Sequence, residues 1–228
     1  MKRYKVKEIF GPTIEGEGSK AGEVVLFLRL SGCNRWSGKE EDRADSICHF
    51  CDTDFFGGEL LERETIVERL RERGEQYYKD KDGNEAHPRM FQLRVVISGG
   101  EPTLQMDYLL LRLLKESNFL IYVETNGSRR IDPKTLDLID HLVVSPKQSE
   151  QLTKIKVCDD LKLLYPYLEG ADMKSFSKIS AENRFIQPIK DSGSYQNYKN
   201  NLNGAINECY KNPEYKLSIQ LHKVIQVE

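Results

Sequence analysis

The stretch Leu93-Arg94-Val95-Val96-Ile97-Ser98-Gly99-Gly100-Glu101-Pro102 carries the strongest indication of how this chain folds. Its first five residues form a short apolar run, as expected of a strand that is covered on both faces. Two glycines follow, and glycines at a strand end let a ligand approach the backbone closely. The carboxylate of Glu101 can accept a hydrogen bond from an ammonium group. By itself a Gly-Gly pair is most often a simple turn, so its meaning depends on the rest of the chain.

Similar apolar runs recur along the chain, with helix-like stretches between several of them. The runs cover residues 24–30, 120–123, 141–144, 161–164, 185–186 and 216–224. The helix-like stretches contain Ile66, Val67 and Leu70, then Leu104, Tyr108, Leu111 and Leu114, then Asp132 and Pro133, and finally residues 194–210. Strands that alternate with helices predict an α/β fold with a parallel sheet. Because 228 residues hold too few units for a complete eight-unit barrel, we expect an incomplete, open (β/α) barrel, with a doubly wound sheet as the alternative.

The length and composition are those of one globular domain, which we expect to span residues 1–228. Acids and bases are interleaved and the net charge is -2, so nucleic acid is a weak candidate partner. No apolar run approaches the length of a membrane span, so no membrane is expected as a partner. The basic N-terminus, residues 1–7, has no apolar stretch after it, which argues against a secretory signal and predicts a cytoplasmic protein. We predict that two polar segments, 34–47 and 76–88, are inserted surface loops.

Three of the five cysteines lie close together in the sequence. Cys33, Cys48 and Cys51 follow the pattern Cys-x14-Cys-x2-Cys, within a loop that we place at 31–53. The Cys-x-x-Cys part brings two thiolates within reach of one metal centre, and three thiolates leave one iron of a [4Fe–4S] cube without a protein ligand. A zinc site that includes His49 and simple coincidence are the alternatives, and spacing alone does not decide between the three. The remaining cysteines, Cys158 and Cys209, are expected to be buried as small apolar residues.

The three cysteines and the Ser98–Pro102 segment together resemble the radical S-adenosylmethionine superfamily. In that superfamily a Gly-Gly-Glu segment holds the amino group of the methionine moiety, and the usual cysteine spacing is Cys-x3-Cys-x2-Cys. Lengthening a flexible loop from three to fourteen residues costs about 1.4 kcal/mol in closure entropy. Cluster ligation can absorb that cost, so the long first gap indicates a subgroup of the superfamily.

Further motifs, in the same order along the chain, resemble those of the 7-carboxy-7-deazaguanine synthase family, in which a fourteen-residue first gap also occurs. These motifs are 10–18 (FGPTIEGEG), Arg29, Cys51-Asp52-Thr53, Glu124-Thr125-Asn126-Gly127, Ser145-Pro146-Lys147, Gln187-Pro188 and His222-Lys223. The resemblance implies a homodimeric carbon–nitrogen lyase with a shortened barrel. It would convert 6-carboxy-5,6,7,8-tetrahydropterin into 7-carboxy-7-deazaguanine with release of ammonia, in the biosynthesis of queuosine and other 7-deazapurines. An external, flavodoxin-like electron donor would reduce the cluster.

The same resemblance implies roles for individual residues. Cys33, Cys48 and Cys51 would hold the [4Fe–4S] cluster, and Thr53 would bind Mg²⁺. The matching positions for S-adenosylmethionine are Phe50, Cys51, Asp52, Gly99, Gly100, Glu101, Ser145, Pro146, Lys147, Gln187, Pro188, Ile189 and Lys190. Those for the pterin substrate are Ile14, Glu15, Gly16, Arg29, Ser98, Glu124, His222 and Glu228. One departure concerns Leu221, which stands where the family often has threonine.

Two other functions stay open at this point. One is a radical enzyme that forms a glycyl radical in a partner protein, which would need a groove for that partner. The other is an interaction module stabilised by zinc. The Gly-Glu-Gly loop, Arg29 and Thr53 favour a small substrate, because an activating enzyme needs no Mg²⁺-bound pterin.

Overall fold

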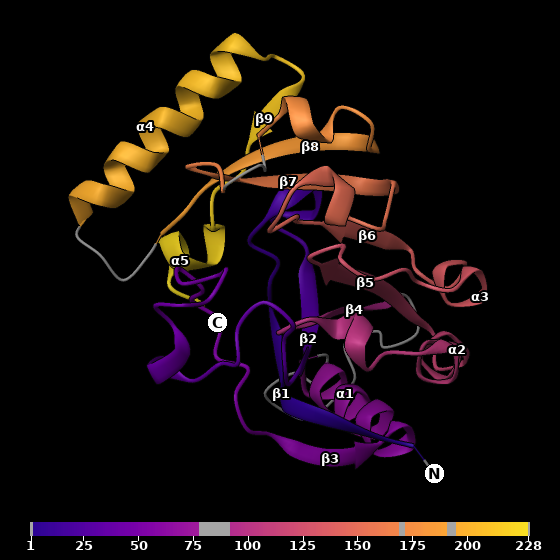
Figure 1. Ribbon diagram of the computed structural model, residues 1–228. Helices are drawn as coiled ribbons and strands as arrows, with labels where there is room; N and C mark the ends of the chain where they lie inside the picture. The colour runs from indigo at the N-terminus through magenta and orange to yellow at the C-terminus, as the bar shows by residue number, and fades with distance from the viewer. Residues whose placement is uncertain (1, 78–91, 169–171, 191–194, 228) are drawn as a thin grey trace.

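The computed structural model describes residues 2–77, 92–168, 172–190 and 195–227, and in these residues nine strands form one open sheet (Figure 1). The order across the sheet is β3-β1-β2-β4-β5-β6-β7-β8-β9. The strands are β1 (Arg3–Ile14), β2 (Val24–Leu30), β3 (Glu59–Glu62), β4 (Leu93–Gly99), β5 (Phe119–Thr125), β6 (His141–Val144), β7 (Val157–Tyr165), β8 (Ser180–Pro188) and β9 (Tyr215–Leu217).

The pairing of the strands distinguishes the two architectures considered from the sequence. Every pair from β2 to β9 is parallel, and the spatial order follows the chain order without a reversal. A doubly wound sheet reverses its order at a switch point, whereas a barrel does not. The open barrel is therefore confirmed, and the doubly wound alternative is wrong. β1 pairs antiparallel with both β2 and β3 and extends the sheet at its first edge.

The helices α1, α2 and α4 pack on the sheet over its main core. The helices are α1 (Arg63–Tyr77), α2 (Tyr108–Glu116), α3 (Pro133–Leu136), α4 (Tyr195–Lys211) and α5 (Leu221–Ile225). Short 3-10 turns are η1 (Gly18–Lys20), η2 (Glu40–Asp42), η3 (Pro102–Leu104), η4 (Glu150–Leu152) and η5 (Lys174–Phe176). α1 packs on β1, α2 on β5 and α4 on β8, while α5 and the loop after β2 lie on the opposite side from α2 and α3 (Figure 1). No helix in the described residues is long and apolar enough to cross a membrane.

The alternation of side chains along each strand divides the sheet into two faces. On β2, Leu26, Leu28 and Leu30 are buried in the main core beneath the helices. The intervening side chains point to the other face, where Val25, Val96 and Tyr122 form a second, smaller cluster. This inner face becomes polar toward the carboxyl ends of the parallel strands, which is where barrel enzymes carry their active sites.

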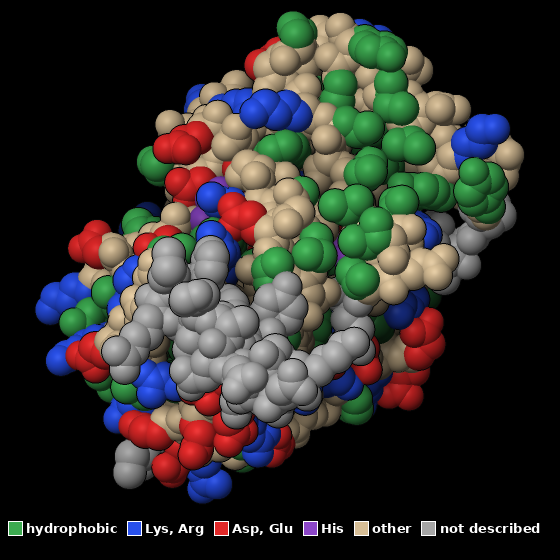
Figure 2. All heavy atoms as spheres, turned by 180° about the vertical axis from the view of Figure 1, so that it is seen from behind, with side chains coloured by type: hydrophobic (Ala, Val, Ile, Leu, Met, Phe, Trp, Pro, Cys, Tyr) green, Lys and Arg blue, Asp and Glu red, His purple; other side chains and the backbone are tan. Residues whose placement is uncertain are grey.

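The surface seen from behind mixes charges of both signs. In Figure 2, Lys and Arg are interleaved with Asp and Glu in the lower half, as the sequence led us to expect. Apolar side chains gather in the upper half, at the height where β7–β9 and α4 lie in Figure 1.

Two sequence-based expectations need correction. The predicted strand over 216–224 is only three residues long, Tyr215–Leu217, and the chain then turns into α5. It leaves the sheet because the Leu221 amide donates to the carbonyl of Gly16 (2.9 Å) and not to β8. Residues 76–77 of the predicted loop 76–88 belong to α1, and 78–88 lie outside the described residues.

The strands β1 and β3 were not predicted. The alternation of Tyr4 and Val6 with charged neighbours was the available signal for β1, since both are almost fully buried. Leu104, assigned from its spacing to the second helix, lies in η3 ahead of α2.

Candidate functional site

A cavity of about 310 Å³ lies at the carboxyl ends of the parallel strands, within the range of sizes typical of small-molecule sites. Most of the residues selected from the sequence line it. They are Ile14, Glu15, Arg29, Cys33, Cys48, Phe50, Cys51, Asp52, Thr53, Ser98, Gly99, Gly100, Glu124, Ser145, Lys147, Gln187, Pro188, Ile189, Lys190 and His222. Gly16, Glu101 and Pro146 do not line it, and Glu228 lies outside the described residues.

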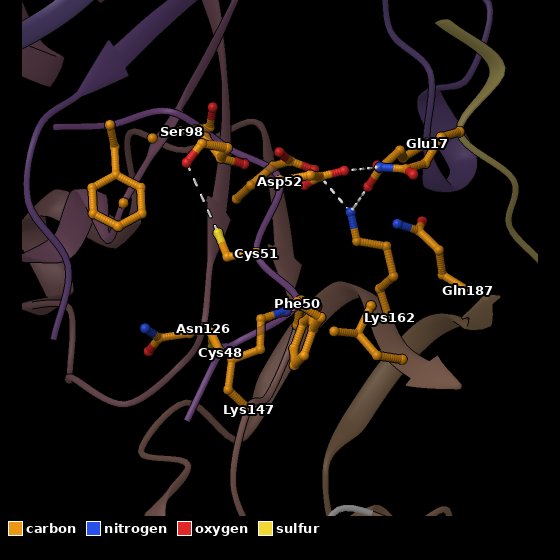
Figure 3. Close-up of a pocket in the computed structure, with 18 of the residues that line it drawn as sticks. Glu17, Cys48, Phe50, Cys51, Asp52, Ser98, Asn126, Lys147, Lys162 and Gln187 are labelled. Carbon is orange, nitrogen blue, oxygen red and sulfur yellow. Dashed lines mark hydrogen bonds and ion pairs between the residues drawn. The ribbon is translucent and has the colours of Figure 1, made fainter. Parts of the chain in front are cut away.

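The cavity has two chemically different halves (Figure 3). Cys48, Cys51 and Phe50 lie together with Lys147 and Asn126 on one side. Glu17, Lys162 and Gln187 lie on the other side, with Asp52 near them. A soft, sulfur-rich region therefore faces a charged, oxygen-rich region across one space.

The cysteine half contains three free thiols. The Cys51 amide donates to the carbonyl of Cys48 (2.9 Å), which closes the tight turn expected of Cys-x-x-Cys. Burial raises the pKa of the Cys33 thiol and raises the pKa of Cys48 to about 11, so both stay protonated until a metal centre displaces the proton.

Three thiols on one cavity wall are the kind of donor that an iron–sulfur cluster takes. Among the described residues, no three His, Cys, Asp or Glu side chains are grouped closely enough to hold one metal ion. A [4Fe–4S] cube binds each cysteine through a different iron and so takes ligands that are further apart. Three free thiols on the wall of one cavity fit that donor set.

The two glycines after β4 are required by the neighbouring strand. Gly99 has φ +125°, and a Cβ atom there would lie 2.1 Å from the carbonyl oxygen of Leu30. A Cβ atom on Gly100 would lie 2.1 Å from the carbonyl oxygen of Gly32 and 3.0 Å from the Cβ of Cys33. The glycines thus let the cluster loop approach β4, and they also line the cavity as the sequence analysis expected.

Glu101 is fully buried, and its carboxylate is engaged by the protein itself. It accepts hydrogen bonds from the amide and hydroxyl of Thr103 (3.0 and 2.5 Å), the hydroxyl of Thr125 (2.6 Å) and the amide of Asn126 (2.8 Å). It therefore ties the glycine loop to the end of β5. Its contact with an ammonium group stays a prediction.

Three carboxylates surround Lys162 in the other half of the cavity. Lys162 forms ion pairs with Glu17 and with Glu124 (3.1 Å), and Gln220 donates to Glu17 (2.9 Å). These contacts lower the pKa of Glu17 to about 2 despite its burial. Burial and the neighbouring negative charges of Glu124 and Glu17 raise the pKa of Glu15 to about 8. At neutral pH Glu15 thus holds a proton beside ionised Glu17.

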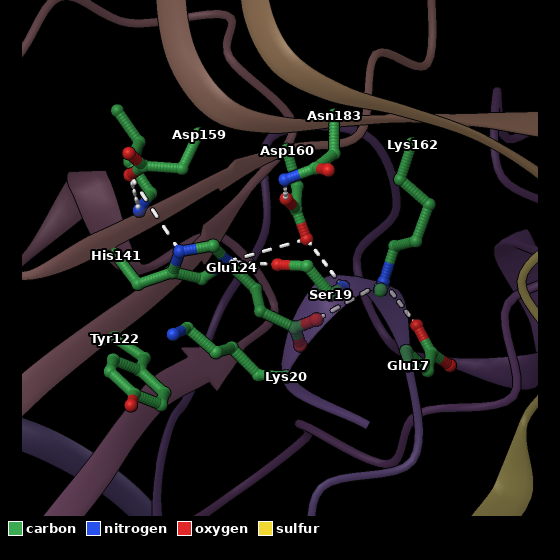
Figure 4. A network of polar contacts seen from close by, with 12 residues as sticks. Glu17, Ser19, Lys20, Tyr122, Glu124, His141, Asp159, Asp160, Lys162 and Asn183 are labelled. Atoms are coloured by element: carbon green, nitrogen blue, oxygen red, sulfur yellow. Dashed lines mark hydrogen bonds and ion pairs between the residues drawn. The ribbon is translucent and has the colours of Figure 1, made fainter. Parts of the chain in front are cut away.

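A second polar network holds the turn that follows Glu17 (Figure 4). The buried carboxylate of Asp160 accepts from the Ser19 amide (2.8 Å) and from the side chain of Asn183 (3.1 Å), and His141 Nε2 lies 3.3 Å away. These residues come from β6, β7 and β8, so the loop that carries Glu15 and Glu17 is fixed to the middle of the sheet.

Arg29 projects from β2 toward the cavity, next to Glu8 on β1. The two residues are cross-strand partners, with Nη1 of Arg29 2.7 Å from Glu8 Oε1. The buried Nε of Arg29 has no hydrogen-bond partner among the described residues. The guanidinium also lies over the ring of Phe10, 5.2 Å from its centroid. Arg29 thus places a cation in the wall of the cavity.

The C-terminal helix α5 packs against the loop before β2. A Cβ atom on Gly16 would lie 2.0 Å from Nδ1 of His222, which explains why Gly16 is covered and does not line the cavity. Lys223 forms an ion pair with Asp52, whose side chain was assigned to S-adenosylmethionine. Burial lowers the pKa of His222.

Comparison with known proteins places the chain in a family. The 7-carboxy-7-deazaguanine synthase of Burkholderia multivorans is 37% identical over 230 residues, which cover 98% of this chain and 99% of that protein. The chain belongs to the 7-carboxy-7-deazaguanine synthase family. The enzyme of the same name from Bradyrhizobium diazoefficiens is 36% identical, with 98% and 99% of the two chains covered.

The fold of this member of the 7-carboxy-7-deazaguanine synthase family also matches that of a solved structure. The crystal structure of QueE from Escherichia coli matches with a TM-score of 0.64 at 22% identity, over 96% of this chain and 95% of that one. No family model matches the chain. The family inferred from the sequence motifs is confirmed.

In this member of the 7-carboxy-7-deazaguanine synthase family, the cavity also contains residues to which the sequence analysis gave no role. They are Phe10, Glu17, Phe27, Arg35, Trp36, Phe55, Thr125, Asn126, Lys162, Leu164, Gln220 and Lys223. Lys162 could have been noticed in the sequence, because it stands within the apolar run 161–164. A lysine in such a run must either lie outside the core or have a buried partner. Glu17 and Asn126 stand within quoted motifs, but nothing in the sequence showed which side chains face the cavity.

Proposed function

We propose that this protein converts 6-carboxy-5,6,7,8-tetrahydropterin into 7-carboxy-7-deazaguanine with release of ammonia, as a carbon–nitrogen lyase. The observation that carries the proposal is the meeting of three free thiols, a Gly-Gly strand end and a lysine–carboxylate group in one cavity. Family membership at 37% identity over nearly the whole chain supports it. Residues 1–228 then form a single radical S-adenosylmethionine domain.

Cys33, Cys48 and Cys51 would hold the [4Fe–4S] cluster in the sulfur-rich half. Cluster and S-adenosylmethionine supply the radical that starts the rearrangement, and the protein supplies position and charge. Lys147 is half-buried in the cavity wall, and its ammonium group donates to the hydroxyl of Ser145 (2.7 Å), so this pair offers a cation and a hydroxyl beside the cysteines. We assign S-adenosylmethionine to this half, between the cysteines, the glycine loop and residues 187–190.

The oxygen-rich half suits the pterin. Protonated Glu15 offers a hydrogen-bond donor, and Glu124, which pairs with Lys162, offers acceptor oxygens to a ring edge that carries both kinds of group. The rings of Phe10 and Phe27 are stacked 4.8 Å apart and form an apolar wall for a planar ligand. The guanidinium of Arg29 lines the cavity and suits the substrate carboxylate, because its planar fork pairs bidentately with such groups.

Thr53 lines the same cavity, and we keep it as the proposed Mg²⁺ ligand. One hydroxyl makes a weak site alone, but Mg²⁺ retains water and borrows oxygens from its substrate. The homodimer, the flavodoxin-like electron donor and the cytoplasmic location are likewise proposals that follow from the family.

The test is an anaerobic assay of the reconstituted protein with reductant, S-adenosylmethionine, carboxytetrahydropterin and Mg²⁺, repeated without Mg²⁺. We expect the deazaguanine product from the wild type and from Cys209→Ser, and none from Cys48→Ser. Cys209 lies on α4 outside the cavity, so it controls for loss of a thiol.

Each alternative gives a different result. No product from wild type with a full complement of iron contradicts the substrate. Colourless protein that binds one zinc and no iron favours the interaction module. A glycyl radical formed in a partner protein favours the activating enzyme.

A further inference from the structure

The cluster loop between Cys33 and Cys48 is built around a buried aromatic pair. Trp36 is only 7% exposed and meets Phe55 edge to face, with ring centroids 5.4 Å apart. The indole N–H of Trp36 donates to the carbonyl of Lys39 (3.0 Å). The Phe55 carbonyl accepts from the amide of Gly32 (3.4 Å). The predicted surface loop 34–47 therefore has a small core of its own.

Arg43 connects this core to the cysteine turn. Its guanidinium carbon lies 4.1 Å from the centroid of the Trp36 ring. Its Nη1 donates to the carbonyl oxygens of His49 (3.0 Å) and Cys51 (2.8 Å), and its Nε donates to both carboxylate oxygens of Glu40 (2.7 and 2.8 Å). One planar group thus contacts the aromatic core, an acid and the backbone of the Cys48–Cys51 turn.

Each of these contacts constrains the direction of the turn. Hydrogen bonds from a cation to a carbonyl are stronger than neutral ones, and a guanidinium stacked on an indole is held in one plane. With the carbonyls of His49 and Cys51 bound to Arg43 and the Cys51 amide bound to Cys48, the backbone of the turn has little freedom left.

We propose that Arg43 is a positioning residue that preforms the Cys48–Cys51 turn for cluster binding. This inference rests on the proposed function in one respect, namely that a cluster binds there. A preformed turn lowers the ordering cost of ligating a cluster across a long first gap, which a flexible loop would incur on binding. Arg43 touches neither cysteine sulfur, so it acts through the backbone alone.

The test compares Arg43→Gln and Arg43→Lys with Lys39→Gln. Lys39 lies in the same loop, and among the described residues its ammonium group pairs with the exposed Glu41, so Lys39→Gln removes the same charge without touching the turn. Iron and sulfide per chain are measured after reconstitution, followed by the rate of iron loss to a chelator. Trp36 is the single tryptophan, so its emission in the metal-free protein reports directly on the aromatic core.

We expect Arg43→Gln to lose iron about 10- to 100-fold faster than wild type, as is usual for outer partners of metal ligands. Its Trp36 emission should shift to the red, its thermal midpoint without metal should match that of Lys39→Gln, and Arg43→Lys should recover part of the iron retention. Equal iron retention in Arg43→Gln and Lys39→Gln overturns the inference, as does a thermal midpoint that falls in step with iron retention. Wild type that binds no cluster overturns the proposed function instead.

Discussion

Lys162 is a fully buried cation whose position depends on carboxylates from two other elements. Glu17 comes from the loop after β1 and Glu124 from the end of β5, and both form ion pairs with it. A buried charge without a partner is strongly destabilising, so the three side chains must be placed together. One lysine cannot compensate the charges of three carboxylates. The pKa of the third, Glu15, is therefore raised.

The pKa of Glu15 gives the first residue-scale prediction. The folded protein holds a proton on Glu15 up to a pH of about 8, whereas the unfolded chain releases it near the ordinary value of a glutamate. The folded state therefore binds more protons in this interval, and stability falls as the pH rises through it. Glu15→Gln has no such proton. Its stability relative to wild type should rise by up to about 1.4 kcal/mol per pH unit across the interval and level off above it.

Urea unfolding of the metal-free protein between pH 5 and 9 measures this difference. The exposed Glu214→Gln is the matched control and should show a difference that does not change with pH. If the difference for Glu15→Gln is also independent of pH, Glu15 is ionised in the folded protein, and its proposed role as a donor to the pterin is contradicted.

At the scale of residues, the sequence predicted which residue types form the site better than it predicted which side chains contact one another. Cys33, Cys48, Cys51 and the glycines were found because motifs preserve residue type and spacing, and all five line the cavity. The partners Glu8 of Arg29 and Glu17 of Lys162 could not be found that way. They depend on strand register and on a fold that brings residues 17 and 162 together.

At the scale of elements, the end of β4 lies very close to the backbone that follows β2. The amide of Gly100 donates to the Leu30 carbonyl (3.1 Å), and the amide of Glu101 donates to the Gly32 carbonyl (2.9 Å). β2 therefore continues beside β4 past the end of the sheet and delivers Cys33 to the glycine loop. The absence of side chains at Gly99 and Gly100 makes this possible.

Gly99→Ala should separate these two elements. Its new methyl group would meet the backbone of Leu30 in a conformation that already disfavours side chains. We expect a loss of about 3 kcal/mol or more in the free energy of unfolding, together with loss of iron retention. Gly57 has a similar positive φ of +82° with nothing within 4 Å, so Gly57→Ala isolates the backbone strain and should cost about 1 kcal/mol with iron retained. Equal effects of the two substitutions would contradict the close approach as the cause.

Parallel strands were easier to predict than the antiparallel edge. β2, β4 and β6 are apolar runs and were found nearly to the residue, because burial on both faces leaves a continuous signal. β1 and β3 have one exposed face and many charged residues, and that pattern resembles a loop unless its period is examined. The apolar residues of 216–224 were read as one strand. The hydrogen bond from Leu221 to Gly16, which accompanies the turn away from the sheet, could not be predicted from them.

At the scale of the whole molecule, the late helix α5 closes a site that begins with the first strand. The Leu221 amide binds the Gly16 carbonyl, Gln220 binds Glu17, and Lys223 pairs with Asp52 in the cluster loop. None of the residues of α5 is buried, so the helix contributes little to the core. Its contacts instead join residues 16–17, in the loop before β2, to Asp52 in the loop after β2. In Figure 1, α5 lies beside the loop after β2.

Removing residues 220–228 should therefore weaken ligand binding while leaving the protein folded. The metal-free protein should stay folded, with a loss of about 1–2 kcal/mol for a few partly exposed polar contacts. Affinity for the pterin should fall about tenfold or more, a loss of about 1.4 kcal/mol, because Glu15, Gly16 and Glu17 lose the helix that holds their loop. Equilibrium binding of pterin and of S-adenosylmethionine to the anaerobic, cluster-loaded protein measures both affinities. The affinity for S-adenosylmethionine should change less.

A shorter deletion of 226–228 keeps α5 and serves as the control. If that deletion alone accounts for the whole loss, the last three residues hold the pterin, and α5 does not act as the clamp.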